Sequence, residues 1–264
     1  PFKKEDICIS ADIRRPDGKT ETVRGFYYAG FIAEPGSGGD HLTACGEPHF
    51  RIRYTPRVKG RHRINLKVKT AHGGRPHQKL ELDVKEKSKG NDFKGFVQVS
   101  QEYPCFFEYN SGQPFKGVGL NIRTPSDTRY KRMARFSLWE DDGLGVYRRL
   151  FPKLAAAGVN VVEVWMASWW LALEWINKAP GFHGVGYFNQ YRAWRLDRLV
   201  ELAAENDIYL LLVLNNHGKF SSFCDQEWNK NPYNVKNDGF LKNPEEYFSN
   251  ERAAKCFKRT VDYI

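Results

Sequence analysis

The sequence contains no apolar run near the ~20 residues that a helix needs to cross a lipid bilayer, so no membrane-spanning segment is expected. It also contains no pair of cysteines at the short spacings typical of zinc sites or redox motifs. We therefore predict mostly free thiols, and neither a disulfide framework nor a bound metal. The five cysteines, an odd number, are scattered along the chain at Cys8, Cys45, Cys105, Cys224 and Cys256.

Acidic residues are scarce in one part of the chain. The 264 residues carry 41 Lys and Arg against 31 Asp and Glu, a net charge of +10. Residues 1–95 hold 20 of the basic and 12 of the acidic residues, which leaves a net of only +2 for residues 96–264. The stretch from Arg51 to Lys69 has eight Lys or Arg and no acid. Such a run favours a solvated sheet face, with an acidic glycan or nucleic acid as the alternative partners.

Short alternating segments fill residues 1–95. A turn at Pro16, Asp17 and Gly18 separates two of them and predicts a hairpin. Charged and apolar residues alternate in HFRIRY, HRINLKVK and KLELDVKE, so each segment is expected to bury one face and expose the other. Five or six such strands predict an all-β antiparallel sandwich domain over residues 1–95, with Lys85–Gly95 as its linker to the next domain.

Residues 96–264 have a different rhythm, in which near-continuous apolar runs alternate with segments of helical spacing. Apolar strands that are joined through helices are typical of a buried parallel sheet. We therefore predict three βα units in this part of the chain. The expected strands are Phe115–Asn121, Gly158–Met166 and Ile208–Gly218, and the expected helices are 145–157, 192–206 and the segment from Ser249 onward.

Aromatic and polar side chains collect where these strands end. Ligands of parallel sheets bind at the carboxyl ends of the strands. Aromatic faces stack on sugar rings, while amides and imidazoles hydrogen-bond to hydroxyl groups. We therefore predict a sugar-binding floor at this edge. Its candidate residues are His217, Asn216, Trp165, Trp169, Trp170, Asn121 and, in the long loop after the third strand, Trp228.

Each candidate also has a plain structural interpretation. An aromatic residue beside a strand is often core, and a histidine or asparagine at a strand end can bond to loop backbone. The long loop also contains Asp225 and Glu227, but nothing in the sequence fixes the separation of their carboxylates. We interpret these two residues as part of a cleft wall rather than as a catalytic pair.

A resemblance to a known family covers nearly the whole chain. Residues 1–95 are similar to a β-sandwich of unassigned function, notably in PDGK, RGFYY and RYTPRVKGRHR. The rest resembles the N-terminal half of a cellulase-like (β/α)8 glycoside hydrolase, in GVNVVEVWMASWWLALEW, YRAWRLDRLVELAAENDIYLLLVLNNHG and NPYNVKNDGFLKNPEEYFSNERAAKCFKRTVDYI. The resemblance implies a multidomain chain, with a sandwich at 1–95 and the first three βα units of a TIM barrel at 96–264.

The family implies hydrolysis of a β-linked glycan with retention, without a metal or organic cofactor. One glutamate would protonate the leaving oxygen and another would attack the anomeric carbon, at ~5–5.5 Å separation. Both are expected beyond Ile264, so no catalytic residue is assigned within the chain, and the chain alone is expected to be inactive. His217 matches a histidine that helps to bind the sugar, whereas Glu163 stands where many relatives carry an arginine.

The expected partner is an oligo- or polysaccharide, neutral or acidic. The remaining barrel strands, from later sequence or from another chain, are expected to cover Ile208–Leu214. No nucleic-acid or membrane partner is expected. The resemblance favours a secreted or periplasmic protein, and a cytoplasmic location stays open. The alternative to an enzyme is a carbohydrate-binding protein without catalysis.

Overall fold

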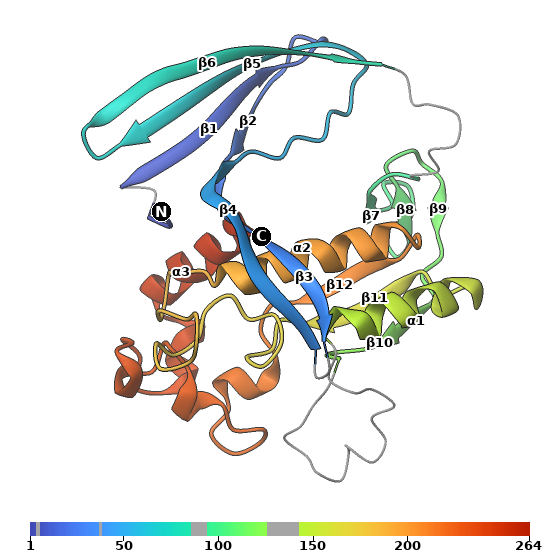
Figure 1. Ribbon diagram of the computed structural model, residues 1–264. Coiled ribbons are helices and arrows are strands. Elements are labelled where there is room, and N and C mark those ends of the chain that lie inside the picture. The colour runs from blue at the N-terminus through green and yellow to red at the C-terminus, as the bar shows by residue number, and fades with distance from the viewer. Residues whose placement is uncertain (4–5, 37–38, 86–93, 126–142) are drawn as a thin grey trace.

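The computed structural model places antiparallel sheets in the first part of the chain, and a small parallel sheet with three α-helices in the second (Figure 1). Most of the predicted linker, Lys85–Gly95, lies outside the described residues. None of the described helices is both long and apolar enough to cross a bilayer. The described residues are 1–3, 6–36, 39–85, 94–125 and 143–264.

A four-stranded antiparallel sheet in the order β2-β1-β5-β6 forms the first layer. β1 (Ile7–Arg14) and β2 (Thr20–Arg24) are joined by the predicted turn, in which Gly18 has a φ of 81° that favours glycine. β5 (Gly60–Thr70) and β6 (Gly73–Val84) form a second hairpin. The expected antiparallel strands and their hairpin turn are therefore confirmed.

A long hairpin of β3 (Phe26–Gly36) and β4 (Gly39–Arg51) runs away from this sheet and packs on helix α2 (Gln190–Ala204) (Figure 1). Phe31 contacts Trp194 of that helix, with ring centroids 6.3 Å apart. The hairpin therefore does not lie face to face on the four-stranded sheet, as a sandwich requires. Its aromatic side chains are buried against the helices instead, which the strand pattern alone did not predict.

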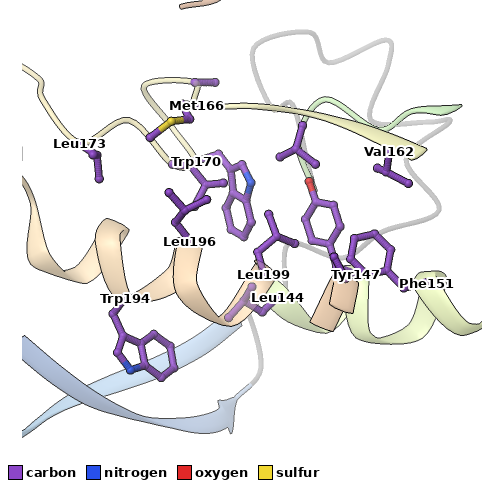
Figure 2. Packing of buried hydrophobic residues seen from close by; sticks show 14 of the residues in the cluster. Leu144, Tyr147, Phe151, Val162, Met166, Trp170, Leu173, Trp194, Leu196 and Leu199 are labelled. Atoms are coloured by element: carbon purple, nitrogen blue, oxygen red, sulfur yellow. The ribbon is translucent and has the colours of Figure 1, made fainter. Parts of the chain in front are cut away.

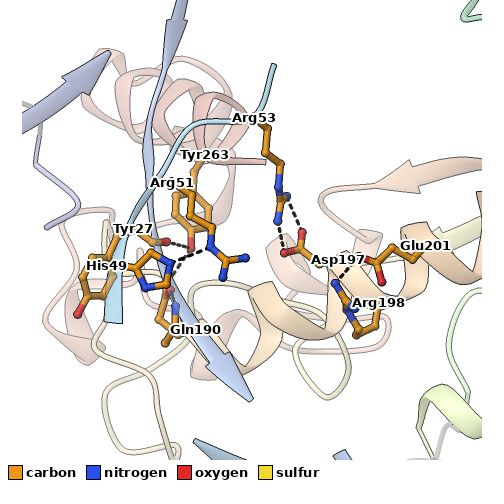
Figure 3. Close-up of polar contacts among 10 residues, drawn as sticks. Tyr27, His49, Arg51, Arg53, Gln190, Asp197, Arg198, Glu201 and Tyr263 are labelled. Carbon is orange, nitrogen blue, oxygen red and sulfur yellow. Dashed lines mark hydrogen bonds and ion pairs between the residues drawn. The ribbon is translucent and has the colours of Figure 1, made fainter. Parts of the chain in front are cut away.

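Polar contacts also tie this hairpin region to the helices (Figure 3). The hydroxyl of Tyr263 donates to the carbonyl of Tyr27 at 2.9 Å. Arg53, which follows β4, forms a bidentate ion pair with Asp197 of α2, with one N–O distance of 2.7 Å. Part of the basic stretch Arg51–Lys69 therefore binds a carboxylate of the βα part, although a solvated face was predicted for it.

Three parallel strands in the order β10-β11-β12 form the predicted second sheet. The first strand is shorter than expected, because Phe115 pairs with Phe107 in a separate antiparallel sheet, β7-β8-β9. The strands are β7 (Val97–Val99), β8 (Phe107–Tyr109), β9 (Pro114–Phe115), β10 (Gly119–Asn121), β11 (Val161–Trp165) and β12 (Tyr209–Val213).

The helices of this part also follow the predicted order. Besides α2, they are α1 (Leu144–Ala156) and α3 (Glu251–Tyr263). Among the described residues β12 is the last strand of its sheet, with Leu211 55% exposed, so these residues form an open sheet and not a barrel. The long loop holds four short 3-10 helices: η2 (His217–Phe220), η3 (Trp228–Lys230), η4 (Val235–Asn237) and η5 (Pro244–Phe248).

The main hydrophobic core lies between the parallel sheet and the helices α1 and α2 (Figure 2). Trp170 stacks on Tyr147 of α1, with ring centroids 5.7 Å and planes 18° apart, and neither side chain is more than 2% exposed. This packing fixes the strands whose ends carry the candidate site. Other fully buried members are Leu144, Phe151, Val162, Val164, Leu171 and Leu199.

Candidate functional site

The three parallel strands end at one edge of their sheet, as the sequence predicted. In the observed register Asn121 of β10 lies opposite Glu163 of β11, and Trp165 of β11 lies opposite Val213 of β12. The loop that leaves β12 then reaches His217. This edge, which we call the strand-end rim, is the candidate site.

Trp165 and His217 stand next to each other on the strand-end rim. Their ring centroids are 5.7 Å apart and their planes are nearly perpendicular, at 87°. The indole Nε1 of Trp165 donates to Oε1 of Glu163 at 2.7 Å, and the guanidinium of Arg123 lies 5.6 Å from the indole ring centroid. The indole is thus fixed by its neighbours, and Glu163 has a role in positioning it.

His217 contacts a carboxylate of the loop rather than loop backbone. Its Nε2 lies 2.8 Å from Oδ2 of Asp225. The His217 side chain is 52% exposed, whereas that of Asp225 is 12% exposed. In a neutral imidazole a carboxylate makes the neighbouring nitrogen the donor and leaves the other nitrogen as an acceptor. His217 can therefore accept a hydrogen bond from a hydroxyl group. Sequence reasoning missed this pairing, since eight residues of loop separate the two.

Glu227 has a different position from Asp225. Its Oε1 accepts a hydrogen bond from Nδ2 of Asn216 at 3.0 Å, and its Oε2 accepts one from Oγ of Ser168 at 2.7 Å. Ser168 follows β11 and Asn216 follows β12, so this carboxylate ties the two loops together. Glu227 is 7% and Asn216 is 3% exposed. Asn216 therefore supports the rim from below rather than lining it.

The other predicted tryptophans are placed in the interior or against it. Trp170 belongs to the main core, and Trp169 packs against that core from outside. Trp228 is 6% exposed and sits in a second cluster with Tyr233 and Leu241. Trp170 and Trp228 are therefore buried core residues, whereas Trp169 is partly buried, as Trp165 is. Trp165 is thus the tryptophan that the described residues set beside His217.

Asn121, the remaining candidate, is exposed at the end of β10. Its Oδ1 accepts a hydrogen bond from the backbone N–H of Arg123 at 3.0 Å. The side-chain carbonyl thereby shapes the chain as it leaves the strand. The structure gives Asn121 this local contact and a place on the same rim.

A buried charged cluster lies beneath the loops of the rim, and sequence reasoning missed it. Lys219 is 8% exposed, and its Nζ donates to the carbonyl of Leu214 at 2.8 Å. Burial lowers the pKa of Lys219 to about 8, against the opposing pull of Glu227 and Glu174. Burial likewise raises the pKa of Glu174 to about 7. No local pattern marks these residues, because only the folded loops bring them together.

No protein-family model matches the chain, and no curated protein matches it either. One similar solved structure is that of a proposed glycoside hydrolase from Bacteroides vulgatus, with 19% sequence identity and a TM-score of 0.49. The similarity covers 79% of this chain but only 37% of that protein. Likeness of that degree does not establish a shared fold or function.

Proposed function

We propose that the chain is the glycan-binding part of a glycoside hydrolase that acts on a β-linked oligo- or polysaccharide with retention. The observation that supports the proposal is the placement of Trp165 beside the hydrogen-bonded pair of His217 and Asp225. An indole offers a face for the C–H groups of a pyranose, and the imidazole accepts a hydrogen bond from a hydroxyl group. The ends of parallel strands are the usual place for such a site.

Neither catalytic carboxyl group is assigned to the described residues. A retaining mechanism needs an acid and a nucleophile ~5–5.5 Å apart across the glycosidic bond. Both oxygens of Glu227 accept structural hydrogen bonds, and Asp225 contacts His217. Under this proposal the acid and the nucleophile are glutamates of polypeptide outside residues 1–264, which also supplies the strands that cover β12. The chain alone is proposed to bind glycan without hydrolysing it.

A carbohydrate-binding protein without catalysis is the second candidate function. The observation that favours it is that both carboxylate oxygens of Glu227 accept hydrogen bonds, from Asn216 and Ser168, which gives this rim carboxylate a structural role. The two candidates differ in whether a form that carries further barrel strands and both glutamates turns over an aryl β-glycoside. Turnover by the chain alone, surviving substitution of Asp225 and Glu227, would show that the active site lies elsewhere.

Binding is tested by titrating the chain with soluble β-linked oligosaccharides, neutral and acidic, using tryptophan fluorescence and calorimetry. Trp165→Ala and His217→Ala are each expected to lower the affinity about five-fold or more, because stacking and hydrogen bonding contribute ~1 kcal/mol or more each. Phe106→Ala is the matched control, since Phe106 is 65% exposed and precedes β8, whose Tyr109 contacts Tyr209 at the start of β12, the end of that strand opposite the rim. Equal affinities for all three variants and the parent chain would refute the proposed site.

A further inference from the structure

The loop that follows β12 brings three metal-ligating side chains together. His217 stands near its start, and Cys224 and Asp225 stand where the loop turns back. One ligand atom from each side chain, namely an imidazole nitrogen, a sulfur and a carboxylate oxygen, lies within 4.8 Å of the other two. Nitrogen, sulfur and oxygen donors thus converge at the side of the strand-end rim.

This donor set suits Zn²⁺ among the common divalent cations. Zn²⁺ binds histidine nitrogen, cysteine thiolate and aspartate oxygen, and a site with three protein ligands leaves the fourth tetrahedral position open. Ca²⁺ and Mg²⁺ prefer shells made of oxygen, and a thiolate selects softer ions. The presence of Cys224 therefore decides the class of ion.

The ligand atoms are close enough for small side-chain movements to complete a tetrahedral site. With metal–ligand bonds of ~2.0–2.3 Å, neighbouring ligand atoms lie roughly 3.3–3.6 Å apart. The widest separation here is up to 4.8 Å, and His217 Nε2 lies 2.8 Å from Asp225 Oδ2. His217 and Cys224 are exposed, so rotation of these two side chains can make the adjustment of about 1 Å.

The backbone of this loop is fixed by contacts that need no metal. A Cβ at Gly218 would lie 2.6 Å from the carbonyl oxygen of Asp225, so this close approach requires glycine. The N–H of Cys224 donates to Oγ of Ser221 at 2.9 Å, and the N–H of Glu227 donates to the carbonyl of Gly218 at 3.0 Å. Because the loop is ordered in advance, less conformational entropy is lost when a ligand binds.

We propose that His217, Cys224 and Asp225 bind one Zn²⁺ ion, with the fourth coordination position open to solvent near Trp165. The inference does not depend on glycan binding, although both sites share His217. Zn²⁺ would replace the direct contact between His217 and Asp225 and would thereby set the position of the imidazole on the rim. The cysteine spacings in the sequence gave no sign of this site, because it contains a single cysteine, Cys224.

The test uses Co²⁺ as a spectroscopic substitute for Zn²⁺ on the full chain after treatment with a chelator. One equivalent of Co²⁺ is expected to produce a thiolate-to-cobalt charge-transfer band that Zn²⁺ then removes. Cys224→Ser should abolish the band. His217→Ala and Asp225→Asn should lower the Zn²⁺ affinity by more than about ten-fold, since loss of even an outer-shell partner costs 10–100-fold.

The controls separate a bound metal from damage to the fold. Cys45→Ser and Cys105→Ser remove exposed thiols elsewhere and should leave the band unchanged. Asp225 has a φ of 48°, which asparagine tolerates, and Cys224 is exposed. In the absence of metal, Asp225→Asn and Cys224→Ser should therefore have the same melting temperature as the parent chain. Absence of Co²⁺ and Zn²⁺ binding, or an unchanged band in Cys224→Ser, would overturn the inference. Oligosaccharide titration of the chelator-treated chain tests the proposed function separately.

Discussion

The four-stranded sheet and the strand-end rim use charged side chains in opposite ways. On the sheet, Arg61 and Asp83 form an ion pair with side chains 58% and 62% exposed. Under the rim, Lys219 and Glu227 are 8% and 7% exposed. An exposed pair contributes about 0–1 kcal/mol, whereas a buried charge that loses its partner costs about 3–5 kcal/mol. Charge on the sheet therefore affects encounters and solubility, while charge under the rim affects the fold itself.

The largest loss of stability is expected when the buried Lys219 is replaced. Lys219→Met should lower the free energy of unfolding by about 3–5 kcal/mol, because Glu227 would stay buried without its nearby cation. Lys67→Met is the matched change on the sheet, where Lys67 pairs with Asp12 and is 53% exposed. That variant should lose at most about 1 kcal/mol. Chemical denaturation of both measures the contrast, and equal losses would contradict it.

The pH dependence of stability should reveal the second buried charge. The pKa of Glu174 rises from 4.5 to about 7 on folding, so the folded chain holds this proton more tightly. Its stabilising contribution is therefore complete below about pH 4.5 and is lost as the pH rises to about 7. At about 1.4 kcal/mol per pKa unit, this proton accounts for about 3 kcal/mol of the fall in the free energy of unfolding between about pH 4.5 and 7. Glu174→Gln should remove that part of the pH dependence.

An exposed carboxylate provides the control for this pH profile. Hydrogen bonds from Ser100 and Gln98 lower the pKa of Glu108 below 4.5. Its contribution is present above about pH 4.5 and is lost only as the pH falls further, so Glu108→Gln should not alter the slope between pH 4.5 and 7. Denaturation midpoints at a series of pH values compare the two variants. A parent-like slope for Glu174→Gln would contradict the predicted proton uptake.

A smaller effect is expected where the basic stretch meets the helices. Arg53 binds Asp197 in a bidentate pair, and its guanidinium also lies 4.6 Å from the ring centroid of Phe26 (Figure 3 shows the ion pair). Arg53→Gln should lower the free energy of unfolding by about 1 kcal/mol. Asp197→Asn tests the same contact from the other side. If the double variant loses as much as the sum of the two single variants, the pair contributes nothing.

The smallest effect is expected on the open face of the sheet. Arg61 and Arg63 contact Glu81 across the strands, and all three side chains are more than half exposed. Changing both arginines to glutamine should leave the midpoint of chemical denaturation unchanged, because exposed ion pairs contribute little to stability. Affinity for a neutral oligosaccharide should stay the same. A large loss of affinity would mean that the sheet takes part in recognition.

Local patterns predicted the elements of the βα part well. The two apolar runs became β11 and β12, and Gly158, at which the second predicted strand begins, follows α1 with a φ of 82°, a conformation common just after a helix end. Helix α3 begins at Glu251, two residues after the start of the predicted segment at Ser249, because the side chain of Asn250 accepts the backbone N–H groups of Arg252 and Ala253. Signals of this kind lie within a few residues, so the sequence contains them directly.

Contacts between distant segments could not be predicted in the same way. Trp165, Trp169 and Trp170 look alike in the sequence, and the place of Trp170 in the core depends on Tyr147 of α1. The meeting of His217 with Asp225 depends on how a loop folds over Gly218. The hairpin β3–β4 has an ordinary strand pattern, and its packing on α2 and α3 decides where its aromatic side chains are buried. Each of these outcomes is set by tertiary packing rather than by periodicity.

The hydrogen bond between Tyr263 and Tyr27 joins residues that are 236 positions apart. Chain entropy is lost in closing so long a loop before the contact can stabilise the fold, and this loss slows folding. During synthesis the β3–β4 hairpin leaves the ribosome long before the helices on which it packs. The aromatic side chains of the hairpin therefore stay exposed to solvent until α2 and α3 have formed. Before this docking the exposed aromatic side chains favour aggregation.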